Sequence, residues 1–184
     1  MQYNVAQLLR GPTGAQRRYQ LEEDISHLDP ELEPVSPLKG KISLLRTSQG
    51  VLVTGKLRTM LRGQCRRCLE FCDVQVTLNL EEEFHPSVSI ADAPVDPIPD
   101  EDYDEALVID EHHILDLTEV VRQGLWLVAP TEALCRPDCA GLCPECGGNR
   151  NLGECQCEQA PIDPRWAALQ ALLTNQIESD ERSD

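Results

Sequence analysis

Aromatic residues and long hydrophobic runs are both scarce in this sequence. Aromatic side chains make up 4% of the 184 residues, and no apolar stretch approaches the roughly 20 residues that a membrane-spanning helix needs. The first ten residues contain no basic region followed by an apolar one, which argues against a secretory leader. We therefore expect a soluble cytoplasmic protein without a membrane partner. In that reducing compartment, clustered cysteines are more often metal ligands than disulfides.

Recognisable catalytic motifs are also missing. The sequence has no glycine-rich phosphate loop, no nucleophile-elbow serine and no carboxylate pair in a supporting context. Its four histidines stand alone or beside acids and do not form a catalytic set. We expect a protein that is not an enzyme.

Two long stretches of the sequence each lack charged residues of one sign. Residues 34–69 contain no acid and hold eight cations: Lys39, Lys41, Arg46, Lys56, Arg58, Arg62, Arg66 and Arg67. From Asp73 to Val121 the pattern inverts, with many acids and no Lys or Arg. The net charge of −16 therefore conceals a basic region, suited to a polyanion such as RNA, and a separate acidic region.

Alternating apolar residues predict an α+β fold built mainly on an antiparallel sheet or a partly closed β-barrel. Strands are expected at 41–47, 51–62 and 73–81, with a further candidate at 3–9. Within 51–62 the apolar residues point one way, and Lys56, Arg58 and Arg62 point the other. Short helices are expected at 116–128 and 163–173, the second started by Asp163 and Pro164.

Changes in composition divide the chain into five regions. They are a basic antiparallel β domain (1–85), a mobile acidic loop (86–112), a helix packed on the sheet (113–130), a cysteine-rich zinc knuckle (131–160), and a C-terminal helix with a frayed tail (161–184). The acidic loop is rich in Pro, Asp and Glu. It offers too little apolar surface to offset the entropy lost on ordering it.

Six of the nine cysteines lie between Cys135 and Cys157. Two residues separate Cys143 from Cys146, and two glycines follow, which is typical of a zinc knuckle. Cys155 and Cys157 can supply the other two thiolates, because alternate residues of an extended segment face the same way. Four thiolates leave no open coordination position, so we expect a structural zinc ion here and not a catalytic one.

A second pair, Cys65 and Cys68, lies about 70 residues upstream of Cys135. Three interpretations stay open. The pair can complete a second zinc site with Cys135 and Cys139, or act as a redox-active dithiol. It can also remain metal-free beside Arg66 and Arg67, which would then perform recognition. The sequence predicts Zn²⁺ as cofactor and leaves open whether one ion or two are bound.

The stretch from Cys139 to Cys157, followed by Asp163-Pro-Arg-Trp-Ala-Ala-Leu169, resembles the bacterial YceD family, also called the large ribosomal RNA subunit accumulation proteins. Cys65-x-x-Cys68-Leu69-Glu70 ahead of an alternating strand, the acidic spacer and the Leu-rich helix ending at Pro130 add to the resemblance. It extends from about Lys39 to Leu173. The resemblance implies a non-enzymatic factor for accumulation or processing of large-subunit ribosomal RNA, in bacteria or plastids.

The basic window and the resemblance together predict a factor in large-ribosomal-subunit biogenesis. Its partners would be ribosomal RNA or the pre-ribosomal large subunit, a basic ribosomal protein, or both. We expect phosphate contacts from five cations: Lys56, Arg58, Arg62, Arg66 and Arg67. Two alternatives stay open, a chaperone or adaptor that binds only a basic ribosomal protein, and a thiol oxidoreductase that uses Cys65 and Cys68.

Overall fold

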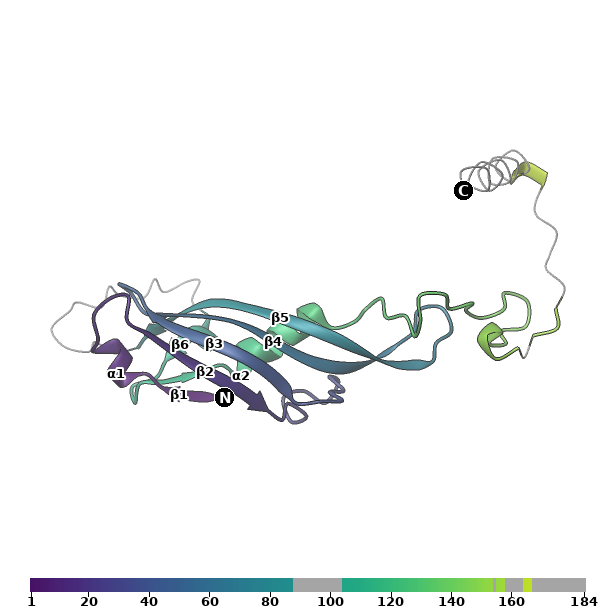
Figure 1. Cartoon of the computed structure of the whole chain (residues 1–184). Coiled ribbons are helices and arrows are strands. Elements are labelled where there is room, and N and C mark those ends of the chain that lie inside the picture. Colours follow the sequence, from purple (N-terminus) through teal and green to yellow (C-terminus); the bar gives the residue numbers. More distant parts are fainter. Residues whose placement is uncertain (88–103, 154, 158–163, 167–184) are drawn as a thin grey trace, which may run out of the picture. The chain divides into compact units, whose positions relative to one another are not determined.

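A five-stranded sheet is the framework of the N-terminal part of the chain (Figure 1). The structure, a computed structural model, describes residues 1–87, 104–153, 155–157 and 164–166. The chain divides into two units, Met1–Cys139 and Ala140–Asp184, and each is described by itself. The sheet lies in the first unit, and its strands follow the order β2-β3-β4-β5-β6.

The strands of this sheet are mainly antiparallel. Four of them pair in turn: β2 (Gln16–Glu23), β3 (Leu38–Arg46), β4 (Val51–Gln64) and β5 (Phe71–Pro86). The short β6 (Val108–Ile109) pairs in parallel with the end of β5. Among the described residues β2 and β6 do not pair with each other, so the sheet is not closed. The prediction of a mainly antiparallel sheet is confirmed, and its barrel form is not.

The alternation predicted within 51–62 is confirmed in β4. Its inward side chains are buried and include Val51, Val53, Leu57 and Leu61. Its outward side chains are exposed and include Lys56, Arg58 and Arg62. Because side chains alternate along a strand, one face of the sheet is apolar and the other carries charge.

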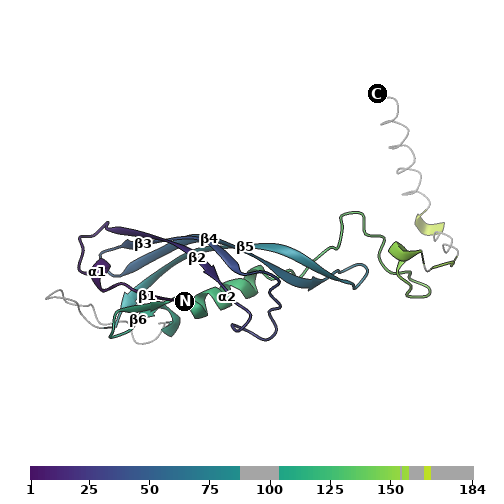
Figure 2. The ribbon, with the colours of Figure 1, turned by 60° about the horizontal axis from the view of Figure 1, so that its bottom comes forward.

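Helix α2 (Thr118–Val128) covers the apolar face of the sheet (Figure 2). Val121 and Leu125 are fully buried there. Gly124 allows a close approach, because a β-carbon at that position would lie 2.7 Å from Leu78 Cδ1. The same core includes residues of α1 (Ala6–Leu9) and of a two-stranded sheet formed by β1 (Gln2–Asn4) and β7 (Ile114–Asp116). The helix predicted at 116–128 is confirmed.

The strand predicted at 3–9 is wrong. β1 ends at Asn4, and Ala6–Leu9 form one helical turn that buries Leu8 and Leu9. A run of apolar residues this short is compatible with either element, because periodicity cannot separate them. The sequence pattern also does not reveal β2, β6 and β7.

Part of the predicted acidic loop is ordered. Residues Glu105–Leu107 form a 3-10 turn, η1, and lead into β6. Asp104 caps this turn by accepting a hydrogen bond from the Ala106 amide at 2.9 Å. Residues 88–103 lie outside the described residues, as does most of the helix predicted at 163–173, of which only the 3-10 turn η3 (Pro164–Trp166) is described. None of the described helices has the length and apolar character needed to cross a membrane.

Candidate metal centres and cationic face

The first cysteine group joins two segments of the first unit. Cys65 and Cys68 lie in the turn between β4 and β5, and Cys135 and Cys139 lie in the segment after α2. The four sulfur atoms all lie within 4.8 Å of one another. The Sγ atoms of Cys65 and Cys139 are 3.9 Å apart, and those of Cys68 and Cys135 are 3.6 Å apart. The structure thus brings together the four cysteines that one interpretation of the sequence places in a single site.

These separations fit a metal site better than disulfides. Four thiolates at about 2.3 Å from a tetrahedral zinc ion stand about 3.8 Å from one another, whereas disulfide-bonded sulfurs stand about 2.05 Å apart. All nine cysteines are free thiols. The donor set therefore suits a soft or borderline metal ion that prefers thiolate ligands, and these four residues could hold it.

The backbone around Cys65 forms a turn that aims amides at sulfur. The Cys65 amide donates to the Glu70 carbonyl, and the Leu69 amide donates to the Cys65 carbonyl, both at 2.8 Å. Leu69 has a φ of 62°, which lies in the left-handed region that normally favours glycine. In this arrangement the Cys68 amide donates to the Cys65 sulfur.

The second cysteine group, in the second unit, repeats this turn. The Cys143 amide donates to the Gly148 carbonyl at 2.8 Å, and the Gly147 amide donates to the Cys143 carbonyl at 2.9 Å. Gly147, with a φ of 72°, takes the place that Leu69 has in the first group. The sulfur atoms of this group also lie within 4.8 Å of one another, and they belong to Cys143, Cys146, Cys155 and Cys157. This group could hold a metal ion of the same class.

Hydrogen bonding and crowding separate the thiol pKa values within these groups. The Cys68 amide does most to lower the pKa of Cys65 to about 6, and the Cys146 amide does most to lower the pKa of Cys143 to about 6. Burial, followed by the neighbouring thiols, raises the pKa of Cys135 to about 12. One thiolate thus forms readily in each group, while further thiolates need a compensating positive charge, which a divalent cation supplies.

Cys72 stands beside the first group without belonging to it. It lies on β5 opposite Gly63, packs against the first group, and has a pKa that burial raises. Cys65 and Cys68 lie in a strand-to-strand turn with two further thiols in reach, whereas a thioredoxin-type pair is found near a βαβ pattern. The geometry favours metal binding over the redox interpretation.

Exposed cations from three strands gather on the outer face of the sheet. Between β3 and β4 the strand register places Lys39 opposite Arg58 and Lys41 opposite Lys56. Between β2 and β3 it places Arg18 opposite Ser43, which is the next outward-facing residue of β3 after Lys41. We call Arg18, Lys39, Lys41, Lys56 and Arg58 the cationic face. A hollow of about 550 Å³ over these strands is lined by Arg18, Lys41, Ser43 and Thr54, among others. Cations beside hydroxyl groups form a surface that suits an anion.

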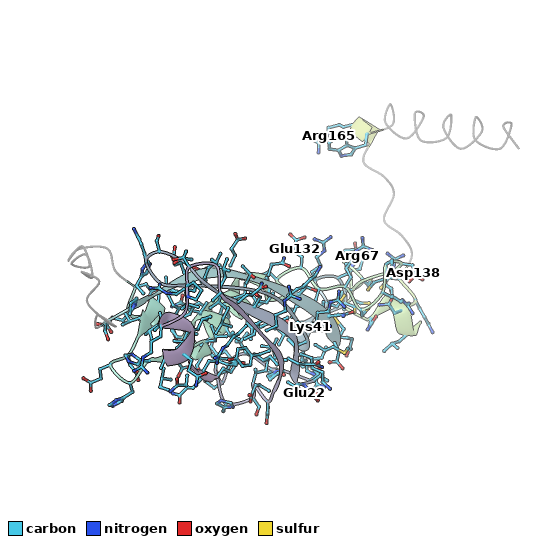
Figure 3. All side chains as sticks on the ribbon, turned by 60° about the vertical axis from the view of Figure 1, so that its left-hand side comes forward. Glu22, Lys41, Arg67, Glu132, Asp138 and Arg165 are labelled. Atoms are coloured by element: carbon cyan, nitrogen blue, oxygen red, sulfur yellow. The ribbon has the colours of Figure 1, made fainter. Side chains whose placement is uncertain are left out.

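Two of the five predicted phosphate contacts, Lys56 and Arg58, belong to the cationic face. The other three are engaged within the first unit. Arg62 Nε lies 3.3 Å from Asp73 Oδ1, Arg66 pairs with Glu132, and Arg67 donates from Nη1 to the Cys139 carbonyl at 3.1 Å. Figure 3 labels Arg67 and Glu132, as well as Lys41 on the sheet. Arg66 and Arg67 therefore help to hold the segment that carries Cys135 and Cys139. All five remain predicted RNA contacts.

A family model matches residues 53–173, about two thirds of the chain, and its description is Large ribosomal RNA subunit accumulation protein YceD. The chain belongs to the YceD family. The YceD segment contains all nine cysteines together with Lys56 and Arg58, but it begins after Arg18, Lys39 and Lys41.

Curated relatives of this YceD chain occur in mycobacteria. An uncharacterized protein of Mycobacterium tuberculosis is 38% identical over 133 residues, which cover 68% of this chain and 57% of the relative. A protein of Mycobacterium bovis gives the same values. One of Mycobacterium leprae is 28% identical over 151 residues, or 81% of this chain and 65% of the relative. The chain thus spans less than two thirds of the length of these relatives. No solved structure matches it.

Sequence reasoning on this YceD chain misses three members of the cationic face. Lys39 and Lys41 stand in the acid-free window, but their place beside Arg58 and Lys56 depends on the register of the β3–β4 hairpin. The residues 48–50 mark that turn and are the signal from which the pairing could be found. Arg18 lies on β2, a strand with too few apolar residues to be recognised.

Proposed function

We propose that this protein is a non-enzymatic factor in large-ribosomal-subunit biogenesis that binds ribosomal RNA through the cationic face. The family description, which names accumulation of large ribosomal RNA, supports the process. The charge of the outer sheet face supports the binding mode, because phosphate contacts from Lys and Arg supply most of the sequence-independent affinity for nucleic acid.

The observation that carries the proposal is the pairing of like charges in the middle of the sheet. Lys39 opposes Arg58 and Lys41 opposes Lys56 on neighbouring strands. Like charges directly opposite one another destabilise a sheet by a few tenths of a kcal/mol up to about 1 kcal/mol per pair. Glu22 offsets Lys39 at 2.6 Å, in an exposed ion pair. A bound polyanion would relieve the repulsion that remains.

The hollow on this face adds hydrogen-bond donors to the charge. Ser43 and Thr54 line it together with Arg18 and Lys41, and the Ser43 hydroxyl already accepts a hydrogen bond from Gln16 Nε2 at 2.6 Å. Hydroxyl and cationic groups together are the usual partners of phosphate oxygens. The hollow therefore suits a phosphate of the RNA backbone.

We infer that zinc is the metal of both cysteine groups and that its role is structural. Four thiolates fill a tetrahedral zinc ion and leave no position for water or substrate. In the first unit the ion would fasten the segment after α2 to the β4–β5 turn. RNA binding and metal binding are thus assigned to different residues.

The test of RNA binding is a double variant, Lys41→Ala with Lys56→Ala. We expect affinity for a large-subunit ribosomal RNA fragment to fall at least about tenfold, and the slope of log affinity against log salt to fall by about two units. Fluorescence anisotropy across a salt series measures both. Thermal unfolding should show unchanged or slightly higher stability, since a like-charge pair is removed.

The matched control is Arg10→Ala with Arg150→Ala. Both arginines are exposed and lie outside the cationic face, so this variant removes the same charge. We expect the control to retain the affinity and the salt slope of the parent protein. Equal losses in the two double variants, or no loss in either, would contradict binding through the cationic face.

A further inference from the structure

One edge of the sheet is open along most of β5. β6 pairs with β5 only at His85 and Pro86. Between Asp73 and Glu83, among the residues that the structure describes, no other strand pairs with β5 on the side away from β4. An unpaired edge of this length presents a row of free backbone donors and acceptors to an added strand.

The ladder geometry identifies which residues face this edge. In an antiparallel ladder, hydrogen-bonded and non-hydrogen-bonded residue pairs alternate. The Cys65 amide donates to the Glu70 carbonyl, so these two residues form a hydrogen-bonded pair. By alternation along the register, the even-numbered residues of β5 are hydrogen-bonded to β4. The odd-numbered residues of β5, Thr77 among them, therefore turn their amides away from β4. The amide of Ser87, which follows β5 and has an odd number like Thr77, donates to the carbonyl of Ile109 in β6 at 2.9 Å.

Two hollows lie beside this edge. One, of about 490 Å³, is lined by Val74–Thr77 of β5 and by residues 128–134. The other, of about 260 Å³, is lined by Leu78, Leu80, Leu107 and Leu127 among others. Leu127 is 88% exposed. An added strand would place every second side chain over these largely apolar walls.

The two hollows beside the edge are lined by acidic residues and by no basic one. No residue that lines either hollow is Lys or Arg, whereas Glu82, Asp104 and Glu132 are among them. On the outward side of β5, Asp73 pairs with Arg62. Thr77 and Asn79 lie opposite Arg58 and Lys56 of β4. Glu81 is exposed and Glu83 is half-buried on the same side. A strand seated here would meet apolar walls on one side, and on the other the carboxylates of Glu81 and Glu83 at one end of the edge.

The geometry points to an extended segment of a partner protein, in which basic and apolar residues alternate, binding as an added strand beside β5. Its backbone pairs with the outward amides of β5, its apolar side chains cover Leu78, Leu80 and Leu127, and its Lys or Arg side chains approach Glu81 and Glu83. Main-chain pairing gives affinity in this mode, and the alternate side chains give specificity. This surface shares no residue with the cationic face, whose Lys56 and Arg58 lie on the next strand opposite Asn79 and Thr77.

The first test uses synthetic peptides as the probe. A ten-residue peptide that alternates lysine with valine or threonine is compared with two forms methylated on alternate backbone nitrogens, each form in a different phase. We expect the parent peptide to bind, one methylated form to lose at least about tenfold in affinity, and the other to bind within about twofold of the parent. Equal binding of both methylated forms, or no binding of the parent peptide, would overturn the proposal.

The second test changes the protein. Thr77→Pro removes one edge-facing amide, and proline is tolerated on an edge strand whose N–H faces outward. Thr77→Ala keeps that amide and is the matched control. We expect the proline variant to bind the parent peptide at least about tenfold more weakly than the alanine variant, with both showing the circular dichroism of the parent protein. Equal affinity of the two variants would mean that the peptide is held by charge alone.

Two further readouts separate strand addition from other modes. On peptide binding, hydrogen exchange should slow at Gln75, Thr77 and Asn79, and change little at Val76 and Leu78, whose amides already pair with β4. The variant with Lys41→Ala and Lys56→Ala should bind the peptide at least as tightly as the parent protein does, because it removes a cation from the strand beside the edge. Protection without this alternation, or loss of peptide binding in that variant, would contradict the assignment.

Discussion

The two cysteine groups share a backbone turn and differ in what they join. In the first group the Cys65–Cys139 contact links residues 74 positions apart in sequence, and three of its four cysteines are buried. In the second group the cysteines span residues 143–157, and only Cys143 is buried. The first group thus closes a long loop of the sheet unit, while the second closes a short local one.

This difference gives the two groups different structural roles: the first cross-links distant segments, and the second stabilises a short local segment. A cross-link that closes a long loop removes more freedom from the unfolded chain than one that closes a short loop. The first group also belongs to the unit that holds the sheet and α2, whereas the second belongs to residues 140–184. A metal ion in the first group should therefore contribute to the stability of the sheet, and a metal ion in the second should not.

The largest expected effect is on the free energy of unfolding of the sheet unit. Cys139→Ser should lower it by about 4 kcal/mol, comparable to opening a cross-linked loop of this length. Cys157→Ser should change it by less than about 0.5 kcal/mol, because the second group is local. Trp126 fluorescence in a Trp166→Phe background follows the unfolding of the sheet unit in denaturant. Equal losses of unfolding free energy in the two variants would show that both groups stabilise the sheet unit to the same extent.

The two cysteine groups should also differ in the rate at which a chelator removes their metal ions. Cys146 and Cys157 are exposed, whereas Cys65, Cys68 and Cys139 are buried. Exposed local structure opens at a lower free-energy cost than buried structure. We expect a chromogenic chelator to take metal from the second group at least about tenfold faster, which gives two phases of equal amplitude. A single phase would show that the two groups open together.

A smaller effect should come from Arg67, which the second group lacks. Arg67 donates to the Cys139 carbonyl, and the matching position in the second turn is Glu145, whose carboxylate cannot donate. Arg67→Ala should destabilise the sheet unit by about 1 kcal/mol and leave the chelation rate of the second group unchanged. Denaturant unfolding of the variant at fixed salt measures the change. Unaltered stability would leave Arg67 free for an RNA contact alone.

The smallest effect should follow from exchanging the residues with positive φ. Leu69→Gly should stabilise the sheet unit by about 0.5 kcal/mol, which is the relief of left-handed strain less the greater unfolded-chain entropy of glycine. Gly147→Leu should weaken metal binding by the second group by about 1 kcal/mol. Competition with a chelator and thermal unfolding measure these changes. A destabilised Leu69→Gly would mean that the leucine side chain makes contacts that outweigh the strain.

The strands and helix with strong periodicity could be predicted from sequence, and the weakly patterned elements could not. β4 alternates buried apolar side chains with more exposed ones over most of its length, whereas β2 has two apolar inward residues, Tyr19 and Leu21. Pairing with β3 makes this segment a strand. That pairing depends on the neighbouring strand and cannot be recognised from the pattern of β2 itself. The short apolar turn of α1 follows the same rule, because burial of Leu8 and Leu9 decides its form.

The candidate sites show a similar limit. The spacing within each cysteine pair suggests a metal ligand set, but the choice of Cys135 and Cys139 as partners of Cys65 and Cys68 depends on where the chain returns after α2. The cationic face depends on register, and a shift by one residue would turn its side chains to the other face. Long-range placement of this kind is fixed by packing and cannot be read from local spacing.

We propose that each cysteine group holds its own structural metal ion. The most direct measurement is metal content per chain, by mass spectrometry of protein purified without added metal, for the parent protein and for Cys65→Ser and Cys143→Ser. We expect two zinc ions per parent chain and one in each variant. A parent chain with one ion or none, or a variant that loses both ions, would contradict this proposal.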